Sequence, residues 1–179
     1  MQAQVTLRGT RPPIWRRLLV PADMTLTRLH RVLQIAMGWQ DSHMHEFRVE
    51  ARHQAGLRSA QIQRSARIGE VLTEIGSSLT YTYDLGDGWE HSIVLEKRFS
   101  AGDDAEYPVC LDGQQACPPE DCGGIPGYSD LLKVLQNPAD ERYEEMREWI
   151  DEDFDPRAFS VEAVNRQIRT GRVRRRSST

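Results

Sequence analysis

The stretch LTYTYDLGDGWEHSIVLEKRF, residues 79–99, decides the fold. Its two runs, residues 79–83 and 89–99, are rich in the β-branched and aromatic residues that favour strands. The five residues between them, DLGDG, contain Asp-Gly, which is typical of a tight turn between antiparallel strands. The stretch therefore predicts a β-hairpin, and hence a sheet, in the middle of the chain.

A second hairpin is predicted at the N-terminus. Residues 4–8 (QVTLR) alternate apolar and polar side chains, and residues 14–20 (IWRRLLV) form another strand-like run. The connection between them is short and contains Gly, Thr and Pro, which favour turns. The hairpin thus supplies two more strands.

An amphipathic helix is predicted after this hairpin. Apolar residues recur at three- and four-residue spacing from Leu26 to Met37, so they fall on one face of a helix of about 13 residues. Thr25 is suited to cap its start and Gly38 to end it. Residues 45–52 then alternate as a further strand, and residues 53–67 suggest an irregular hairpin.

The last third of the chain is predicted to be mainly helical. A short edge strand is expected at residues 107–111, and helices are expected to begin at Ser129 and near Ala139 and to span 159–168. We therefore expect one α+β domain over residues 1–169, whose helical part covers about 128–169, followed by a disordered basic tail. The expected architecture is a mixed β-sheet with one early packed helix, of the β-grasp or α/β-roll kind, plus C-terminal helices.

The charge of the chain argues against a broad nucleic-acid-binding face. The 179 residues carry a net charge of −4 and have a pI of about 5.8. Acids gather at residues 140–155, whereas residues 166–179 hold six arginines and no acid. The sequence has no apolar run long enough to span a membrane and no apolar signal-peptide core, which predicts a cytoplasmic protein.

A loop rich in cysteine, proline and glycine suggests a metal site. The stretch YPVCLDGQQACPPEDCGGIPGY, residues 107–128, holds all three cysteines, at Cys110, Cys117 and Cys122. Thiolates suit zinc, and the fourth ligand is expected from His43, His45 or His91. His43 and His45 lie two apart on an extended segment and face the same side. The alternatives are a dithiol with a redox role and small buried hydrophobic cysteines in a rigid loop.

Acidic and aromatic residues around the central turn form a second candidate cluster. On a strand, Trp89 and His91 share one face, and Asp84 and Asp87 flank the preceding turn. A carboxylate beside an imidazole can orient a base or hold a metal. The alternative is ordinary turn chemistry, in which each Asp caps its own backbone.

Two further charged groups are candidates for binding. Glu120 and Asp121 lie between the last two cysteines and are expected to cap the helix near Ser129 or to receive a basic partner. The arginines of the tail can contact phosphates, or they form a solvated end; they are Arg172, Arg174, Arg175 and Arg176.

Several of these motifs together resemble the plasmid ORF-3-like family. The matching segments are VTLRGTRPPIWRRLLVPADMTLTRLHRVLQIAMGW (5–39), HMHEF (43–47), YTYDLGDGWEHSIVLEK (81–97), CPPEDCGGIPGY (117–128) and FDPRAFSVEAVNRQI (154–168). The resemblance implies an α+β fold, with some members carried on mobile elements and given resolvase-like labels. A serine resolvase needs a nucleophilic Ser near an Arg cluster and a helix-turn-helix, and neither is evident here.

Three functions are compatible with the sequence, and whether the protein is an enzyme stays open. The first is a non-enzymatic binding or interaction module of a mobile element, which uses the aromatic and acidic surface around Trp89 and the cysteine loop to bind a protein partner. The first is favoured, because a sheet of this kind without an evident nucleophile and base fits binding more simply than catalysis. The second is a metal-dependent, zinc hydrolase-type enzyme with ligands among the cysteines, histidines and aspartates named above. The third is a nucleic-acid-binding accessory protein that uses the arginine tail.

Overall fold

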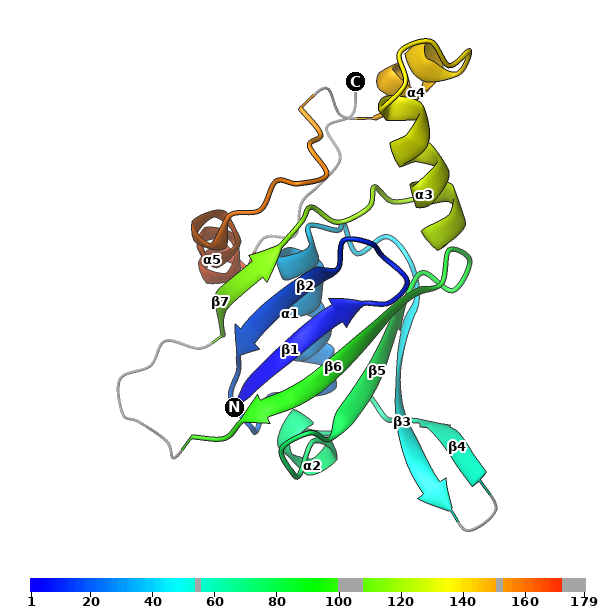
Figure 1. The fold of residues 1–179 in the computed structure, drawn as a ribbon. Coiled ribbons are helices and arrows are strands. Elements are labelled where there is room, and N and C mark those ends of the chain that lie inside the picture. The colour runs from blue at the N-terminus through cyan, green and yellow to red at the C-terminus, as the bar shows by residue number, and fades with distance from the viewer. Residues whose placement is uncertain (54–55, 100–107, 151–152, 172–179) are drawn as a thin grey trace.

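The central hairpin lies in the middle of a seven-stranded sheet in the computed structural model, which describes residues 1–53, 56–99, 108–150 and 153–171 (Figure 1). The strand order is β4-β3-β5-β6-β1-β2-β7. The strands are β1 (Gln2–Leu7), β2 (Ile14–Leu19), β3 (His45–His53), β4 (Gly56–Gln61), β5 (Ser78–Tyr83), β6 (Trp89–Lys97) and β7 (Val109–Gln114). Both predicted hairpins are present, and β1 joins them by pairing with β6.

The α+β class is confirmed, but the sheet is not mixed. Every strand pair among the described residues is antiparallel. The expected mixture of parallel and antiparallel strands is therefore corrected, and the β-grasp or α/β-roll arrangement is not confirmed. The reason is that the chain builds the sheet from consecutive hairpins, which require no parallel crossover.

One face of the sheet is buried and the other is partly exposed. Alternate residues of β6, from Trp89 to Leu95, are fully buried, and the residues between them are half-buried. The same alternation holds in β1 and β2. Helix α1 (Leu26–Met37) lies behind the sheet in Figure 1 and packs on the buried face. As predicted, the Thr25 side chain caps its start and Gly38 (φ 93°) ends it.

The C-terminal helices surround one end and one edge of the sheet. Helices α3 (Gly124–Leu135) and α4 (Tyr143–Trp149) lie beyond the end of β1 and β2, and α5 (Val161–Thr170) lies beside β7 (Figure 1). A short helix, α2 (Ile68–Val71), precedes β5. The Ser160 side chain caps α5 as predicted.

Helix α3 begins six residues earlier than predicted. Ser129 was expected to cap it, but the helix starts at Gly124, so Ser129 lies inside the helix. Pro126 is compatible with this because the first turn of a helix leaves its backbone N–H groups without internal partners. The Gly-Gly-Ile-Pro-Gly sequence resembles a loop, which is why the sequence pattern misplaces the helix start.

Asn165 of α5 completes the backbone hydrogen bonds of the edge strand β7. The Cys110 N–H donates to Asn165 Oδ1 at 2.7 Å, and Asn165 Nδ2 donates to the Cys110 carbonyl at 2.8 Å. One side chain thus satisfies both backbone groups of a residue at the edge of the sheet, and it fixes α5 against β7.

The buried Arg16 of β2 joins four parts of the fold. Its guanidinium donates to the carbonyl of Ala36 at 2.7 Å and to the carbonyls of Trp15, Gln114 and Gln115, each at 2.8 Å. It also stacks over the Phe159 ring, 4.1 Å from the centroid. Ala36 lies in the last turn of α1, whose carbonyls lack partners within the helix. Arg16 therefore links β2, the end of α1, the end of β7 and the segment before α5.

None of the described helices is long and apolar enough to cross a membrane.

Replacement of Arg16 should strongly destabilise the protein. An Arg16→Met variant leaves the four carbonyl oxygens without their donor, and we expect it to lower the free energy of unfolding by about 4 kcal/mol. Arg16→Lys should recover only part of this loss, because one ammonium lacks the five fixed donors of guanidinium. Urea unfolding of both variants tests this, with the exposed Arg31→Met as control. Equal stability of Arg16→Met and the control would contradict it.

Candidate functional site

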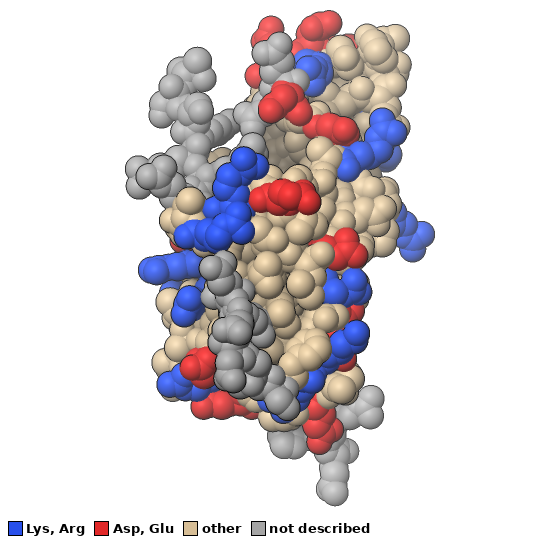
Figure 2. All heavy atoms as spheres, turned by 90° about the vertical axis from the view of Figure 1, so that its left-hand side faces the viewer, with Lys and Arg blue, Asp and Glu red and all other residues tan. Residues whose placement is uncertain are grey.

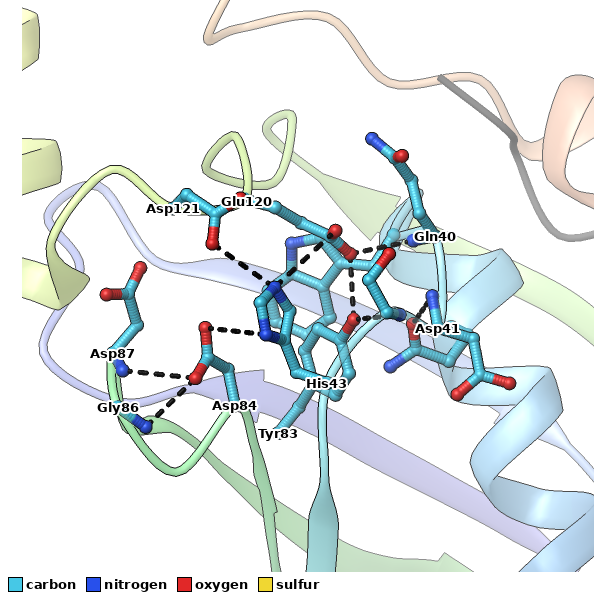
Figure 3. A network of polar contacts seen from close by, with 12 residues as sticks. Gln40, Asp41, His43, Tyr83, Asp84, Gly86, Asp87, Glu120 and Asp121 are labelled. Atoms are coloured by element: carbon cyan, nitrogen blue, oxygen red, sulfur yellow. Dashed lines mark hydrogen bonds and ion pairs between the residues drawn. The ribbon is translucent and has the colours of Figure 1, made fainter.

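Three segments far apart in the sequence meet around the imidazole of His43 (Figure 3). His43 lies in the loop between α1 and β3, Asp84 begins the β5–β6 turn, and Glu120 and Asp121 belong to the cysteine loop. The strand pairing explains the meeting: His45 pairs with Tyr83, so the residues just before β3 lie beside those just after β5. Asp84 N–H donates to the Met44 carbonyl at 2.9 Å and holds the two segments together.

Carboxylates surround both nitrogens of the His43 ring. Nδ1 lies 3.7 Å from Asp84 Oδ2, and Nε2 lies 3.2 Å from Asp121 Oδ1 and 3.9 Å from Glu120 Oε2. Nε2 is buried but makes no hydrogen bond, since its contact with Asp121 does not have hydrogen-bond geometry. Among the described residues, one group of three ligand-type side chains has its ligand atoms within 4.8 Å of one another: His43, Asp84 and Asp121.

Hydrogen bonds fix two of these carboxylates in place. Asp84 Oδ1 accepts from the N–H groups of Gly86 (2.9 Å) and Asp87 (3.3 Å), which leaves Oδ2 directed at His43. Glu120 Oε1 accepts from the Tyr83 hydroxyl and from the Gln40 N–H, both at 2.8 Å (Figure 3). In each case one oxygen is held by the scaffold and the other faces the imidazole.

The backbone around the site adopts a conformation that L-residues rarely take. Three of the four non-glycine residues with positive φ in the described chain are Asp41 (58°), Asp84 (54°) and Asp121 (61°). Aspartate tolerates this region better than most residues, but the conformation still costs free energy. Two of the three supply carboxylates to the His43 cluster, so the strained backbone sets the direction of those side chains.

The cluster carries an excess of negative charge. Every ion pair that the described residues form with Asp84, Glu120 and Asp121 is with His43, and none is with Lys or Arg. The Asp84 and Glu120 side chains are only 11% and 8% exposed, so water screens them poorly. Three carboxyl groups face one imidazole, so acidic groups outnumber basic groups in the cluster.

The cluster lies at the rim of a cavity of about 1040 Å³, called here the acidic groove. Its charged lining consists of Glu120, Asp121, Asp153 and Asp155, with His43 and Arg16 as the basic groups. The guanidinium of Arg16 is already bound to four carbonyls. Aromatic rings from the C-terminal segments, including Trp149 and Phe159, line the other part.

The cysteines do not join this cluster. All three are free thiols, and burial raises the pKa of Cys110 to about 11 and those of Cys117 and Cys122 to about 12. Burial thus disfavours the thiolate form that binds metal. The described residues contain no group of three close ligand atoms that includes a cysteine. The predicted set of three cysteines with His43 or His45 is therefore not brought together, and His43 meets carboxylates instead.

The second predicted cluster is divided between the surface and the core. Asp84, Glu120 and Asp121 meet at His43, and Asp87 Oδ2 accepts from the Gly123 N–H at 3.2 Å beside them. Trp89 and His91 are completely buried beneath the site, so they form no aromatic surface. Glu120 and Asp121 do not cap a helix at Ser129, because α3 begins before it.

Two further histidines, His45 and His91, contact the core rather than the cluster. The His45 ring stacks on His30 at 3.5 Å, and burial, with His30 nearby, lowers the pKa of His45 to about 4. Burial also lowers the pKa of His91 to about 4, and its Nδ1 contacts the Tyr81 carbonyl at 3.2 Å. Residues Arg172 to Arg176 of the predicted basic tail lie outside the described residues.

Sequence reasoning missed Tyr83 and Gln40, which hold Glu120. No local pattern marks them, because their partner is 37 or 80 residues away. The pairing of β3 with β5 is the signal that could have placed Tyr83 beside the His43 segment, but the strand order was not available from the sequence.

Comparison with known proteins shows close similarity over nearly the whole chain. Residues 1–163 match the family described as plasmid pRiA4b ORF-3-like protein. "Uncharacterized protein y4hQ" of Sinorhizobium fredii (strain NBRC 101917 / NGR234) is 38% identical over 175 residues, 94% of this chain and 90% of that protein. The crystal structure of a protein of unknown function, MM3350 from Methanosarcina mazei Go1, has a TM-score of 0.81 at 33% identity, over 90% of this chain and 94% of that chain.

Stability should fall as the pH drops from 6.5 toward 4. In this range the unfolded chain binds protons on His45 and His91, whereas the folded protein keeps both neutral, so acid favours unfolding. For the fully buried His91 the effect is about 3 kcal/mol at pH 4. We expect His91→Gln to show a shallower loss of unfolding free energy than the parent between pH 6.5 and 4.5, measured by urea unfolding. Identical slopes would show that His91 does not contribute.

Proposed function

This chain belongs to the plasmid pRiA4b ORF-3-like protein family, and from that premise we propose that it is a divalent-metal-dependent enzyme of the hydrolase type. Its metal ligands are His43, Asp84 and Asp121. The observation that carries the proposal is the uncompensated charge of the cluster. Asp84 and Glu120 are buried carboxylates, and their ion pairs in the described chain lead only to one imidazole. Buried charges need a counter-charge, and a divalent cation balances the excess.

The ligand set indicates which metals fit. One imidazole nitrogen with carboxylate oxygens suits borderline divalent ions such as Zn²⁺ and Mn²⁺. Three protein ligands are typical of catalytic rather than structural zinc sites, since positions remain for water and substrate. The His43 side chain is 28% exposed and Asp121 is 62% exposed, so the site opens to solvent on the side of Asp121.

The neighbouring residues supply what hydrolysis needs. A divalent metal held by His43, Asp84 and Asp121 would supply a Lewis acid that lowers the pKa of a water molecule. Glu120, held at Oε1 by Tyr83 and Gln40, directs Oε2 toward the cluster and would act as the general base. The acidic groove beside the cluster provides room for a substrate.

The lining of the groove argues against a nucleic-acid substrate. Four acids line it, and the charge of its arginine, Arg16, is directed at backbone carbonyls. On the face shown in Figure 2, the coloured basic and acidic side chains are interspersed, without one broad basic area. Phosphate backbones bind to concentrated positive charge, so a neutral or cationic substrate fits this groove better.

A metal-dependent binding module is the second candidate. Met44 and Leu85, next to His43 and Asp84 in the chain, are 68% and 51% exposed. Exposed apolar side chains beside a metal site favour contact with a partner. This candidate uses the same ligands but requires no Glu120 base.

Metal binding is the first test of the proposal. We expect the protein to bind one equivalent of Zn²⁺ or Mn²⁺ in isothermal titration calorimetry. His43→Ala, Asp84→Asn and Asp121→Asn should each weaken binding by more than the roughly 10- to 100-fold that loss of an outer-shell partner costs. Asp23→Asn is the matched control, because the Asp23 side chain is 80% exposed and lies away from the site. No binding, or equal binding by all variants, would refute the metal site.

Hydrolysis is the second test, and it separates the two candidates. At saturating metal, we expect the parent to hydrolyse p-nitrophenyl esters or a p-nitroanilide, and Glu120→Gln to reduce kcat by about 10²- to 10⁴-fold as loss of a general base does. Glu74→Gln serves as the control, because Glu74 is exposed and lies outside the lining of the groove. Tight metal binding without hydrolysis of any of these substrates would favour the binding module.

A further inference from the structure

The acidic groove extends beyond the His43 cluster to two further aspartates. Asp153 and Asp155 line it from the segment between α4 and α5. Asp153 is exposed and forms no ion pair with a described residue. Asp155 is 57% exposed, and its Oδ1 lies 3.9 Å from Arg157 Nε. Arg157 is itself 86% exposed and is not part of the lining, so this long contact neutralises Asp155 only weakly.

The chain that leads to these aspartates is strongly acidic. Residues 140–155 contain nine acids and two arginines. Arg142 contacts Asp130 and Asp140, and Arg147 also has a partner. Three exposed acids of α4, whose Trp149 lines the groove, add to the negative potential there: Glu144, Glu145 and Glu148.

Few cationic groups offset this charge. Arg16 lines the groove, but its guanidinium is bound to four carbonyls, and His43 faces the carboxylates of its own cluster. The other arginines of the neighbouring helices are exposed and lie outside the lining: Arg28 and Arg31 on α1, and Arg166 and Arg169 on α5. The end of the groove at Asp153 and Asp155 therefore favours a cationic occupant.

Aromatic rings beside the two aspartates suit arginine in particular. The Trp149 side chain is 37% exposed and lines the groove. Phe159, in the same wall, already accepts the guanidinium of Arg16 over its ring at 4.1 Å. A guanidinium stacks on aromatic faces and forms paired hydrogen bonds with carboxylates, whereas an ammonium does so less well.

The chain carries such a cationic segment next to the groove. Residues 172–179, RVRRRSST, hold four arginines, and no acid occurs after Glu162. They follow Gly171, which ends α5, and Gln167 of the same helix lines the groove. The end of α5 lies about 5 Å beyond Gln167, and five extended residues span about 17 Å. Residues 172–176 are therefore long enough to reach back to the groove.

We propose that the arginine tail of this chain, residues 172–176, binds in the acidic groove at Asp153, Asp155 and Trp149. The covalent link gives the tail a high effective concentration, so individually weak ion pairs suffice to hold it there. Because the same groove leads to the His43 cluster, the bound tail limits the access of larger molecules to that cluster.

Trypsin cleavage of the full-length protein tests this contact. Cleavage after Arg172 to Arg176, followed by mass spectrometry, should be at least about 5-fold faster in the double variant Asp153→Asn, Asp155→Asn, because a bound tail is protected. Asparagine keeps the Oδ1 that accepts from the Arg157 N–H, so the backbone of the segment stays fixed. The matched control is Asp23→Asn with Glu74→Gln, which removes the same charge at exposed positions outside the lining. Equal cleavage rates in the parent and the Asp153, Asp155 variant would overturn the proposal.

A peptide of residues 171–179 gives a second test, by calorimetric titration. We expect it to bind at least about 10-fold more tightly to a variant whose four tail arginines are replaced by glutamine than to the parent, whose own tail competes. Higher salt should weaken this binding. Equal affinity for both proteins, or no saturable binding to the variant, would contradict the proposal. Cleavage of the tail that is slowed only by an added single-stranded oligonucleotide would assign the arginines to nucleic acid instead, and would also overturn it.

The proposal is independent of metal binding and hydrolysis. Asp153 and Asp155 are not among the proposed metal ligands, and both tests are done in EDTA. Failure of tail binding therefore leaves the metal site untouched, and a protein that binds no metal still answers whether the tail occupies the groove.

Discussion

The guanidinium of Arg16 is the interaction on which the arrangement around the site depends. A buried positive charge is stable only when other charges or dipoles solvate it, and here backbone carbonyls from β2, the end of α1 and the end of β7 do so. The end of α1 leads directly into the loop that carries His43, and the end of β7 leads into the loop that carries Glu120 and Asp121. Arg16 fixes the points where both loops begin. It therefore helps to determine how close His43 comes to Glu120 and Asp121.

The same principle of paired polar groups explains the rest of the site. Asp84 uses one carboxylate oxygen to complete its own turn, and Glu120 uses one to bind Tyr83 and the backbone of Gln40. Each residue thus has a structural oxygen and a free oxygen. The free oxygens converge on His43 because strand pairing and loop anchoring leave them no other direction. The concentration of negative charge is therefore a property of the scaffold.

Much of the fold could be predicted from local chemistry, whereas the site could not. The Asp-Gly turn, the periodicity of α1 and the caps Thr25 and Ser160 each depend on residues within one turn or one hairpin. The start of α3 was missed because Gly and Pro usually interrupt helices, although both are compatible with a first turn. The contact of His43 with Asp84 and Asp121 depends on strand order and loop path, which no short pattern encodes. The spacing of the cysteines suggests a metal site, but burial raises the pKa values of Cys117 and Cys122 and so disfavours the thiolate. Burial depends on the whole fold, so the sequence around the cysteines does not reveal it.

The side chain of Asn165 has a consequence for how the protein behaves at high concentration. An edge strand with free N–H and C=O groups is a template on which another chain can add a strand, and such addition leads to aggregation. The Asn165 amide bonds the N–H and the carbonyl of Cys110 as a neighbouring strand would. Both backbone groups at this position of β7 are therefore already paired. Helix α5 therefore covers this edge of the sheet and disfavours the addition of a strand from another chain at that position.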